Sequence, residues 1–274
     1  MKELRIVFEE KYPQRMVVLD YFEQANNCYA VWANMTKLKL ISFISYMENR
    51  CSKNSARYYA SILKAVLNMY SDEDVIPCKD FKKILTVRKE VTANMFLSIS
   101  DLKKIEALEN LTESQNLIRC QFLIGCYTGA RHSDCIKITA ENVINNTLSY
   151  VSQKTKIQAT VPVRPSILEM IEYVKDKPDV SDCFFNRTIR KICEKAGIKE
   201  KVKVFVGGKE KTGYKYSFVS SHTARRSFAS NLYLLGADVY AISAMMGHAS
   251  VKQTEGYICV QLKELPEKAM EYFR

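Results

Sequence analysis

The strongest constraint on the fold is a stripe of apolar residues in the first part of the chain. Its members recur three or four residues apart, and this spacing places them on one face of a helix. They are Tyr59, Ile62, Leu63, Val66, Leu67 and Tyr70. Ser52 or Ser55 precedes the stripe, and either side chain can cap the first turn. Because apolar residues from Leu40 onward follow the same spacing, this part is expected to be a helical domain.

A small antiparallel sheet is expected in the second part of the chain. Two strands are expected at 148–152 and 157–163, since apolar residues of the latter alternate with polar or small ones. Residues 153–156 then form the turn between the strands. Before the sheet, an apolar helix over 117–127 is expected to end at Gly129, a residue type that suits the end of a helix.

Further helices are expected on both sides of this sheet. One should open at Ser100 with Asp101 in its first turn, where a carboxylate favours the helix dipole. Others are expected near 165–175 and 187–196, and three more should close the chain. The Gly/Lys-rich stretch 206–215 is expected to be a loop. Together these features predict a mainly α fold with a small antiparallel sheet.

A polar, basic and weakly periodic stretch over 87–96 has the character of a linker between domains. It divides the chain into two expected domains. Residues 1–90 would form an all-helical N-terminal domain, and residues 91–274 would form a mixed α+β domain.

The chain carries 41 Lys and Arg against 30 Asp and Glu, a net charge of +11. This excess suits a polyanionic partner, because bound phosphates release condensed counterions, and a solvated basic surface explains it equally well. Nine cysteines without a C-x-x-C pair, and only three histidines, argue against a zinc site of the usual spacing. An odd number of cysteines fits a reducing compartment. With no apolar signal core and no apolar run long enough to span a membrane, a cytosolic protein without a membrane partner is expected.

Four short stretches carry the chemistry of the second domain. They are TGARHSD (128–134), QKTK (153–156), SHTARRSFAS (221–230) and MMGHASVKQTEGYI (245–258). In this order they resemble the tyrosine recombinase and integrase family, and the basic helical first domain resembles that family's core-binding domain. Each stretch alone is weakly specific, whereas the ordered set is highly specific. The family's catalytic positions are filled here by Arg131, Lys154, His222, Arg225, His248 and Tyr257.

The residue types suit phosphodiester chemistry without a metal ion. Such chemistry needs fixed cations in place of the ion, and a guanidinium holds two phosphate oxygens while staying charged. Arg131 and Arg225 would hold the scissile phosphate from two sides, although either one alone would be taken for a surface arginine. His222 and Arg225 are three residues apart at the start of a helix expected over 223–234, so they share a face beside a helix N-terminus that favours anions. The family's acidic residue after its first arginine appears as Asp134.

Tyr257 is the expected nucleophile, and its distance from Gly247 and His248 singles it out among 16 tyrosines. Ser250 and Gln253 match a capping box, so a short helix is expected to carry Tyr257 on its second turn. A free tyrosine has a pKa of about 10. Attack at neutral pH therefore requires a group that accepts the hydroxyl proton.

By resemblance, His222 is the base that accepts this proton and Lys154 is the acid that protonates the leaving 5′-hydroxyl. Lys154 lies in the expected turn between the strands, where without the other motifs it would be interpreted as a solvated lysine, and Lys156 is a rival. The resemblance gives no role to the third histidine, His132.

The resemblance implies a site-specific recombinase that forms a covalent 3′-phosphotyrosyl link and needs no metal, ATP or other cofactor. Its implied partners are double-stranded DNA, held by both domains, and further copies of the chain in a tetramer on two DNA sites. Residues 262–274 are expected to dock on a neighbouring copy, or else to pack on their own domain. The expected location is the cytoplasm, in association with the nucleoid.

Three other functions remain open. A type IB-like topoisomerase would use the same chemistry, a DNA-binding protein of the same fold would lack catalysis, and a basic helical scaffold would lack both. The histidine at position 248 and the small helical first domain favour recombination over topoisomerase activity. The filled catalytic set favours an enzyme. No stretch of the sequence is expected to form an additional arm-binding domain.

Overall fold

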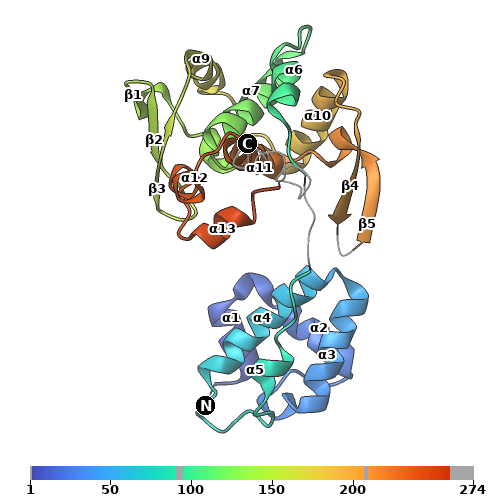
Figure 1. Cartoon of the computed structure of the whole chain (residues 1–274). Coiled ribbons are helices and arrows are strands. Elements are labelled where there is room, and N and C mark those ends of the chain that lie inside the picture. The colour runs from blue at the N-terminus through green and yellow to red at the C-terminus, as the bar shows by residue number, and fades with distance from the viewer. Residues whose placement is uncertain (1, 91–94, 207–208, 260–274) are drawn as a thin grey trace, which may run out of the picture. The chain divides into compact units, whose positions relative to one another are not determined.

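The computed structural model describes residues 2–90, 95–206 and 209–259 (Figure 1). Within these ranges the chain is mostly helical and carries two small sheets, so the mainly α fold class with a small antiparallel sheet is confirmed. No helix in the described ranges is long and apolar enough to cross a lipid bilayer.

Two compact units make up the chain. The first comprises residues 1–92 with 205–210, and the second comprises 93–204 with 211–274. Each unit contains its own clusters of buried apolar side chains. A separate core is the usual mark of a unit that can fold by itself.

The first 90 residues are helical wherever the structure gives them regular secondary structure. The α-helices are α1 (Leu4–Lys11), α2 (Val17–Asn26), α3 (Lys37–Arg50), α4 (Lys53–Met69) and α5 (Phe81–Ile84). Short 3-10 helices occur at Pro13–Arg15 and Trp32–Asn34.

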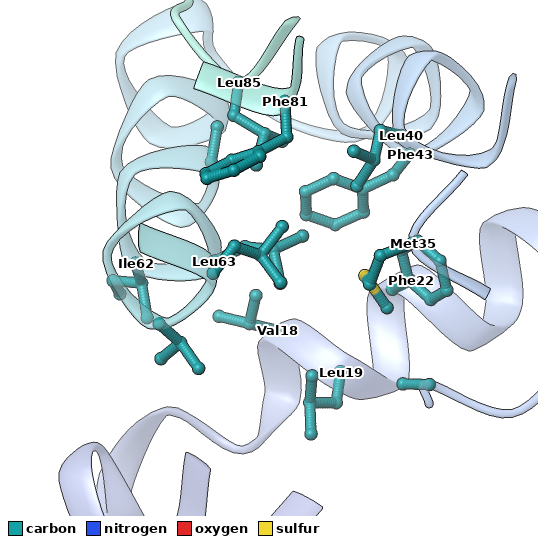
Figure 2. Close-up of a cluster of buried hydrophobic side chains, with 14 of the residues drawn as sticks. Val18, Leu19, Phe22, Met35, Leu40, Phe43, Ile62, Leu63, Phe81 and Leu85 are labelled. Atoms are coloured by element: carbon teal, nitrogen blue, oxygen red, sulfur yellow. The ribbon is translucent and has the colours of Figure 1, made fainter. Parts of the chain in front are cut away.

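Helix α4 is the helix that the apolar stripe predicts. The hydroxyl of Ser52 accepts a hydrogen bond from the backbone N–H of Ser55 at 3.2 Å, so Ser52 is the N-cap. The stripe faces the core, where Figure 2 shows Leu63 of α4 among side chains from the neighbouring helices. The rings of Phe22 and Phe43 lie 6.0 Å apart in this cluster. Burying side chains of this size stabilises the unit by about 2 kcal/mol each.

Residues 95–206 and 209–259 form eight α-helices and two sheets, and these include all the described residues of the second unit. The helices are α6 (Ile99–Glu106), α7 (Glu113–Thr128), α8 (His132–Cys135), α9 (Pro165–Val174), α10 (Asp182–Lys195), α11 (Ser221–Leu234), α12 (Val239–Met245) and α13 (Val251–Glu255). The strands are β1 (Val143–Ile144), β2 (Thr147–Val151), β3 (Gln158–Pro162), β4 (Lys201–Val206) and β5 (Lys209–Tyr214). Short 3-10 helices occur at Ala140–Asn142 and Lys215–Phe218.

The three-stranded sheet has the order β1-β2-β3 and is antiparallel throughout. Strands β2 and β3 match the two predicted strands, and Tyr150 pairs with Ala159 across them. Strand β1 was not expected from the sequence. It joins β2 through Asn145 and Asn146, whose φ angles of 49° and 58° fit a two-residue hairpin turn.

The predictions for residues 209–214 and for the start of α6 are wrong. Residues 209–214, expected to be a loop, form strand β5 of a two-stranded sheet with β4. Helix α6 begins after Ser98 and not at Ser100, because Ser98 and Asp101 form a capping box in which each side chain bonds the other's backbone N–H.

Helix α7 is the centre of the second unit, and it contacts α6, α8, α9, α10 and α11 (Figure 1). It ends as predicted at Gly129, whose φ of 68° lies in the left-handed region. A Cβ atom at this position would lie 2.6 Å from the ring of Phe228. Because the chain turns here next to α11, Arg131 is placed beside the residues of that helix.

Candidate active site

A cavity of about 260 Å³ lies in the second unit between α8, α10, α11, α13 and the turn that joins β2 to β3. Its lining residues are Arg131, His132, Ser133, Lys154, Asp182, Ser221, His222, Arg225, Gln253 and Tyr257. The fold therefore brings five of the six predicted site residues to one space. The sixth, His248, contacts Arg225 directly.

Arg131 immediately precedes α8 and is held by the end of the sheet. Its guanidinium donates a hydrogen bond to the hydroxyl of Ser152 at 2.7 Å, and that hydroxyl donates to the carboxylate of Asp134 at 3.0 Å. The other carboxylate oxygen of Asp134 accepts the backbone N–H of Gln153 at 3.1 Å. Asp134 therefore fixes both the orientation of Arg131 and the start of the turn that carries Lys154.

Arg225 lies on α11 and is 1% exposed. Its guanidinium donates to the carbonyl oxygen of Gly129 and, at 3.2 Å, to that of Met246. Burial lowers the pKa of Arg225, and the nearby charge of Arg131 lowers it further. These bonds place a cation at the cavity and also connect the ends of α7 and α12.

His248 is buried and its hydrogen bonds define its tautomer. Nε2 lies 2.6 Å from the guanidinium of Arg225, which can only donate, so Nε2 is the acceptor. The proton is then on Nδ1, which donates to the hydroxyl of Thr254 at 2.9 Å. Burial, together with the charges of Arg225 and Arg131, lowers the pKa of His248 to about 4. The imidazole is neutral at physiological pH and orients the guanidinium.

Tyr257 does not lie on a helix, which corrects the prediction. Helix α13 ends at Glu255, and the side chain of Ser250 makes no capping hydrogen bond. The backbone N–H of Tyr257 instead bonds the carbonyl of Thr254 at 2.8 Å, in the turn that follows the helix. Its ring is stacked on His248 at 5.2 Å between centroids. The aromatic ring is therefore held by packing within the cavity wall.

Lys154 and Lys156 are distinguished by their positions in the β2–β3 turn. Lys154 is exposed and lines the cavity. Lys156 has a φ of 57° and is not among the lining residues. The hydroxyl of Thr155 donates to the carbonyl of Gly247 at 3.1 Å, which ties this turn to the segment before His248. The geometry favours Lys154 over its rival as the residue that reaches the site.

His222 lies in the first turn of α11. The preceding residue, Ser221, donates its backbone N–H to the side-chain oxygen of Asn186 at 2.8 Å, which fixes the start of the helix. Burial is the main cause that lowers the pKa of His222, and Arg226 and other cations add to it. The lowered pKa leaves the imidazole unprotonated at neutral pH, as a proton acceptor must be.

Several residues of the site were not predicted. Ser152 and Thr254 hold Arg131 and His248, and His132 and Asp182 line the cavity. Only Ser152 carried a signal, since the alternation of β2 points it to the same side as buried Tyr150. The others depend on which helices pack together, which no local pattern of one sequence reveals.

The charges of the cavity suit a phosphate group. Its permanent cations are Arg131, Lys154 and Arg225, and Asp182 is the carboxylate among the lining residues. Within the described parts of the chain, no three His, Cys, Asp or Glu side chains gather closely enough to hold a metal ion. The arrangement can therefore hold an anion beside a tyrosine hydroxyl and a neutral imidazole.

Comparison with known proteins identifies the family. Residues 96–264 match the sequence profile of the phage integrase family. The integrase of Escherichia phage P2 is 28% identical over 133 residues, covering 47% of this chain and 34% of that protein. The tyrosine recombinase XerC of Thermodesulfovibrio yellowstonii is 27% identical over 233 residues, covering 79% of this chain and 74% of that protein. This chain thus matches only about a third of the length of the phage protein.

Solved structures with the same fold were also found. A XerH site-specific recombinase bound to a palindromic difH substrate has a TM-score of 0.67 at 16% identity, over 97% of this chain and 80% of that one. The Tn1549 transposon integrase in complex with a circular intermediate DNA has a TM-score of 0.69 at 13% identity, over 99% and 100%.

The chain belongs to the phage integrase family of tyrosine recombinases, because the family profile covers more than half of its length. It is accordingly an enzyme of the tyrosine recombinase class, the class that the ordered motifs predicted.

Proposed function

We propose that this protein is a site-specific recombinase that cuts and rejoins duplex DNA through a 3′-phosphotyrosyl intermediate, without metal or ATP. The observation that carries the proposal is the cavity in which Arg131, Lys154, His222 and Arg225 surround Tyr257. Relatives whose names or structures describe recombination and DNA complexes support it.

In the cleavage step, the hydroxyl oxygen of Tyr257 attacks the scissile phosphorus and the bond from phosphorus to the 5′ oxygen breaks. The hydroxyl proton passes to His222, whose lowered pKa keeps it unprotonated beforehand. Lys154 gives a proton to the departing oxygen, so a free 5′-hydroxyl remains. The phosphate keeps its bond to the 3′ oxygen and becomes a diester of the tyrosine.

The two arginines stabilise the charge that develops on the phosphate in the transition state. Arg131 and Arg225 are held by fixed hydrogen bonds before substrate arrives, so little reorganisation is needed during the reaction. His248 contributes no charge and acts by orienting Arg225.

Rejoining reverses this chemistry on a new strand. The 5′-hydroxyl of the partner strand attacks the phosphotyrosine, loses its proton to Lys154, and displaces Tyr257, which recovers a proton from His222. Because the phosphodiester energy is kept in the tyrosyl link, no nucleotide is consumed.

A nicked duplex that traps the cut strand tests this proposal. Incubation in EDTA should give a protein–DNA adduct on a denaturing gel, since the site uses side-chain cations. An adduct that appears only when magnesium is restored would contradict the metal-free mechanism. Exchange between two plasmid-borne sites, as against relaxation of a single supercoiled plasmid, would separate a recombinase from a topoisomerase.

We further propose that residues 1–90 form a DNA-binding domain and 91–274 the catalytic domain, and that four copies assemble on two DNA sites in the nucleoid-associated cytoplasm. One structural neighbour is described as a lambda integrase tetramer bound to a Holliday junction. The segment 262–274, proposed to contact a neighbouring copy, lies outside the described residues. Deleting it should spare single-site binding in a gel shift and weaken two-plasmid recombination.

A further inference from the structure

His132 has no role in the family resemblance, yet it lies in the wall of the active cavity. Its ring packs on Phe185 with 4.2 Å between centroids, and its side chain is 14% exposed. Nδ1 lies 3.5 Å from a carboxylate oxygen of Asp182. Nε2 is buried and has no hydrogen-bond partner among the residues that the structure describes. The imidazole is thus fixed by an aromatic ring on one side and contacts a carboxylate on another, and burial lowers the pKa of His132 even though Asp182 raises it.

Asp182 is an unexpected residue in this cavity. It is the first residue of α10, where a carboxylate favours the helix dipole, and its side chain is 80% exposed, so it is not held by the core. It is the carboxylate among lining residues that are otherwise cationic or neutral. A negative charge in a pocket for phosphate weakens binding, because like charges repel. The helix dipole does not require that this carboxylate line the cavity, and from the cavity wall its charge acts on the two imidazoles that line the same space.

The first turns of α10 also support the proposed base. Asn186, one turn after Asp182, accepts the backbone N–H of Ser221 at 2.8 Å and so fixes the residue before His222. Asp182 and His222 line the same cavity. One short stretch of helix thereby positions both a carboxylate and the start of the segment that carries the imidazole.

The charges around His222 come from three elements. Arg225 and Arg226 belong to α11, Lys154 to the β2–β3 turn, and Asp182 to α10. Burial is the largest cause that lowers the pKa of His222, the three cations lower it further, and Asp182 raises it. An imidazole surrounded by cations alone would be a weaker base, because its protonated form would be less stable.

We propose that Asp182, held in place by His132, sets the proton affinity of His222 and thereby tunes the base of the cleavage reaction. This inference rests on the proposed role of His222. Both Asp182 and His132 are positioning residues, since neither needs to touch the DNA. The packed ring of His132 explains how a largely exposed carboxylate is kept at one place in the cavity.

Titration of the imidazoles by NMR tests the proposal without DNA. The full chain has three histidines, so their signals can be assigned with His132→Gln and His222→Gln. In Asp182→Asn, His222 should titrate at lower pH than in the wild type, because the anion that favours its protonated form is gone. Asp179→Asn is the matched control, since Asp179 is also exposed but does not line the cavity. An unchanged titration of His222 in Asp182→Asn would overturn the proposal.

The pH dependence of cleavage gives a second and independent readout. Single-turnover cleavage of nicked DNA requires unprotonated His222, so its acid limb should move to lower pH in Asp182→Asn while the plateau rate falls. DNA binding should tighten by roughly twofold to fivefold, the scale of one exposed charge interaction. Slower chemistry with tighter binding is a combination that a merely damaged fold does not produce.

His132→Gln should change the profile in the same direction as Asp182→Asn and add nothing to it in the double variant. The same dependence of the cleavage rate on pH in the wild type and in all variants would contradict the proposed role of Asp182. If the wild type forms no adduct at all, the proposed recombinase chemistry fails, whereas the titration of His222 still decides whether Asp182 acts on it.

Discussion

At the scale of single residues, removing the hydroxyl of Tyr257 should abolish DNA cleavage and leave DNA binding almost unchanged. Tyr257→Phe keeps the ring that stacks on His248 and removes only the oxygen. We expect no covalent adduct with nicked DNA and a DNA affinity within about twofold of the wild type, because an aromatic contact is retained. Tyr240→Phe is the control, since Tyr240 is 73% exposed. An adduct that survives in Tyr257→Phe would assign the nucleophile to another residue.

Arg131 is expected to act on the rate more than on affinity. Arg131→Ala should slow single-turnover cleavage by roughly a hundredfold or more, the effect of removing one transition-state donor. Exposed Arg187→Ala is the comparison, because it removes the same charge from the surface of α10. The rate and the dissociation constant are measured on the same nicked site. Equal losses in both would reduce Arg131 to a binding residue.

The buried imidazole of His248 makes stability depend on pH. Its pKa falls from 6.5 in the unfolded chain to about 4 in the fold, so below pH 6.5 the unfolded state binds a proton that the folded state refuses. Protonation of His248 therefore leaves the free energy of unfolding unchanged above about pH 6.5. As the pH falls towards 4, it lowers the free energy of unfolding by at most about 3 kcal/mol. Urea unfolding of the wild type and His248→Gln should show a difference that shrinks over this window. A constant difference would refute the linkage.

At the scale of elements, local sequence signals gave the helices and strands that depend on local chemistry. The stripe of α4, the alternation of β3 and Gly129 at the end of α7 each have a cause within a few residues. The motif order also predicted five residues that line one cavity. These features could be predicted because periodicity, capping and motif spacing are properties of the chain itself.

Other elements could not be predicted because tertiary contacts decide them. Strand β5 consists mostly of exposed polar residues, so its sequence lacks the apolar alternation of a half-buried strand. The helix before Tyr257 ends at Glu255, where Gly256 follows as a poor helix former, and Thr254 within this helix is buried and bonds His248. His132 and Asp182 meet because α8 packs near α10.

The end of α7 offers a test of how tightly the site is built. Gly129→Ala should destabilise the protein by roughly 2 to 4 kcal/mol, because a left-handed φ is strained for alanine and its Cβ would strike the ring of Phe228. Gly197 has a similar φ of 72° with no described atom within 4 Å, so Gly197→Ala should cost about 1 kcal/mol. Urea denaturation compares the two. Equal losses would show that the ring moves aside without cost.

At the scale of the whole molecule, two units with separate cores should act as two linked DNA-binding modules. The isolated second unit should fold and bind a single site at least about a hundredfold more weakly than the full chain, since linkage raises effective concentration. Affinity of the full chain should fall steeply with salt, as many phosphates are neutralised. Gel shifts over a range of salt measure both. Equal affinity of the unit and the chain would mean that residues 1–90 contribute little to binding.

The hydrogen bonds of Arg225 determine which residues would be substituted first in a related chain that had lost its activity. Its guanidinium joins the carbonyl oxygens of Gly129 and Met246, so losing it would harm folding before it harmed catalysis. Lys154, exposed in its turn, could disappear with little effect on the fold. A descendant that has lost activity would therefore retain the buried Arg225, and Lys154 would be substituted first. In a genome survey, the presence of Lys154 and Tyr257 is therefore better evidence of an active enzyme than the presence of Arg225.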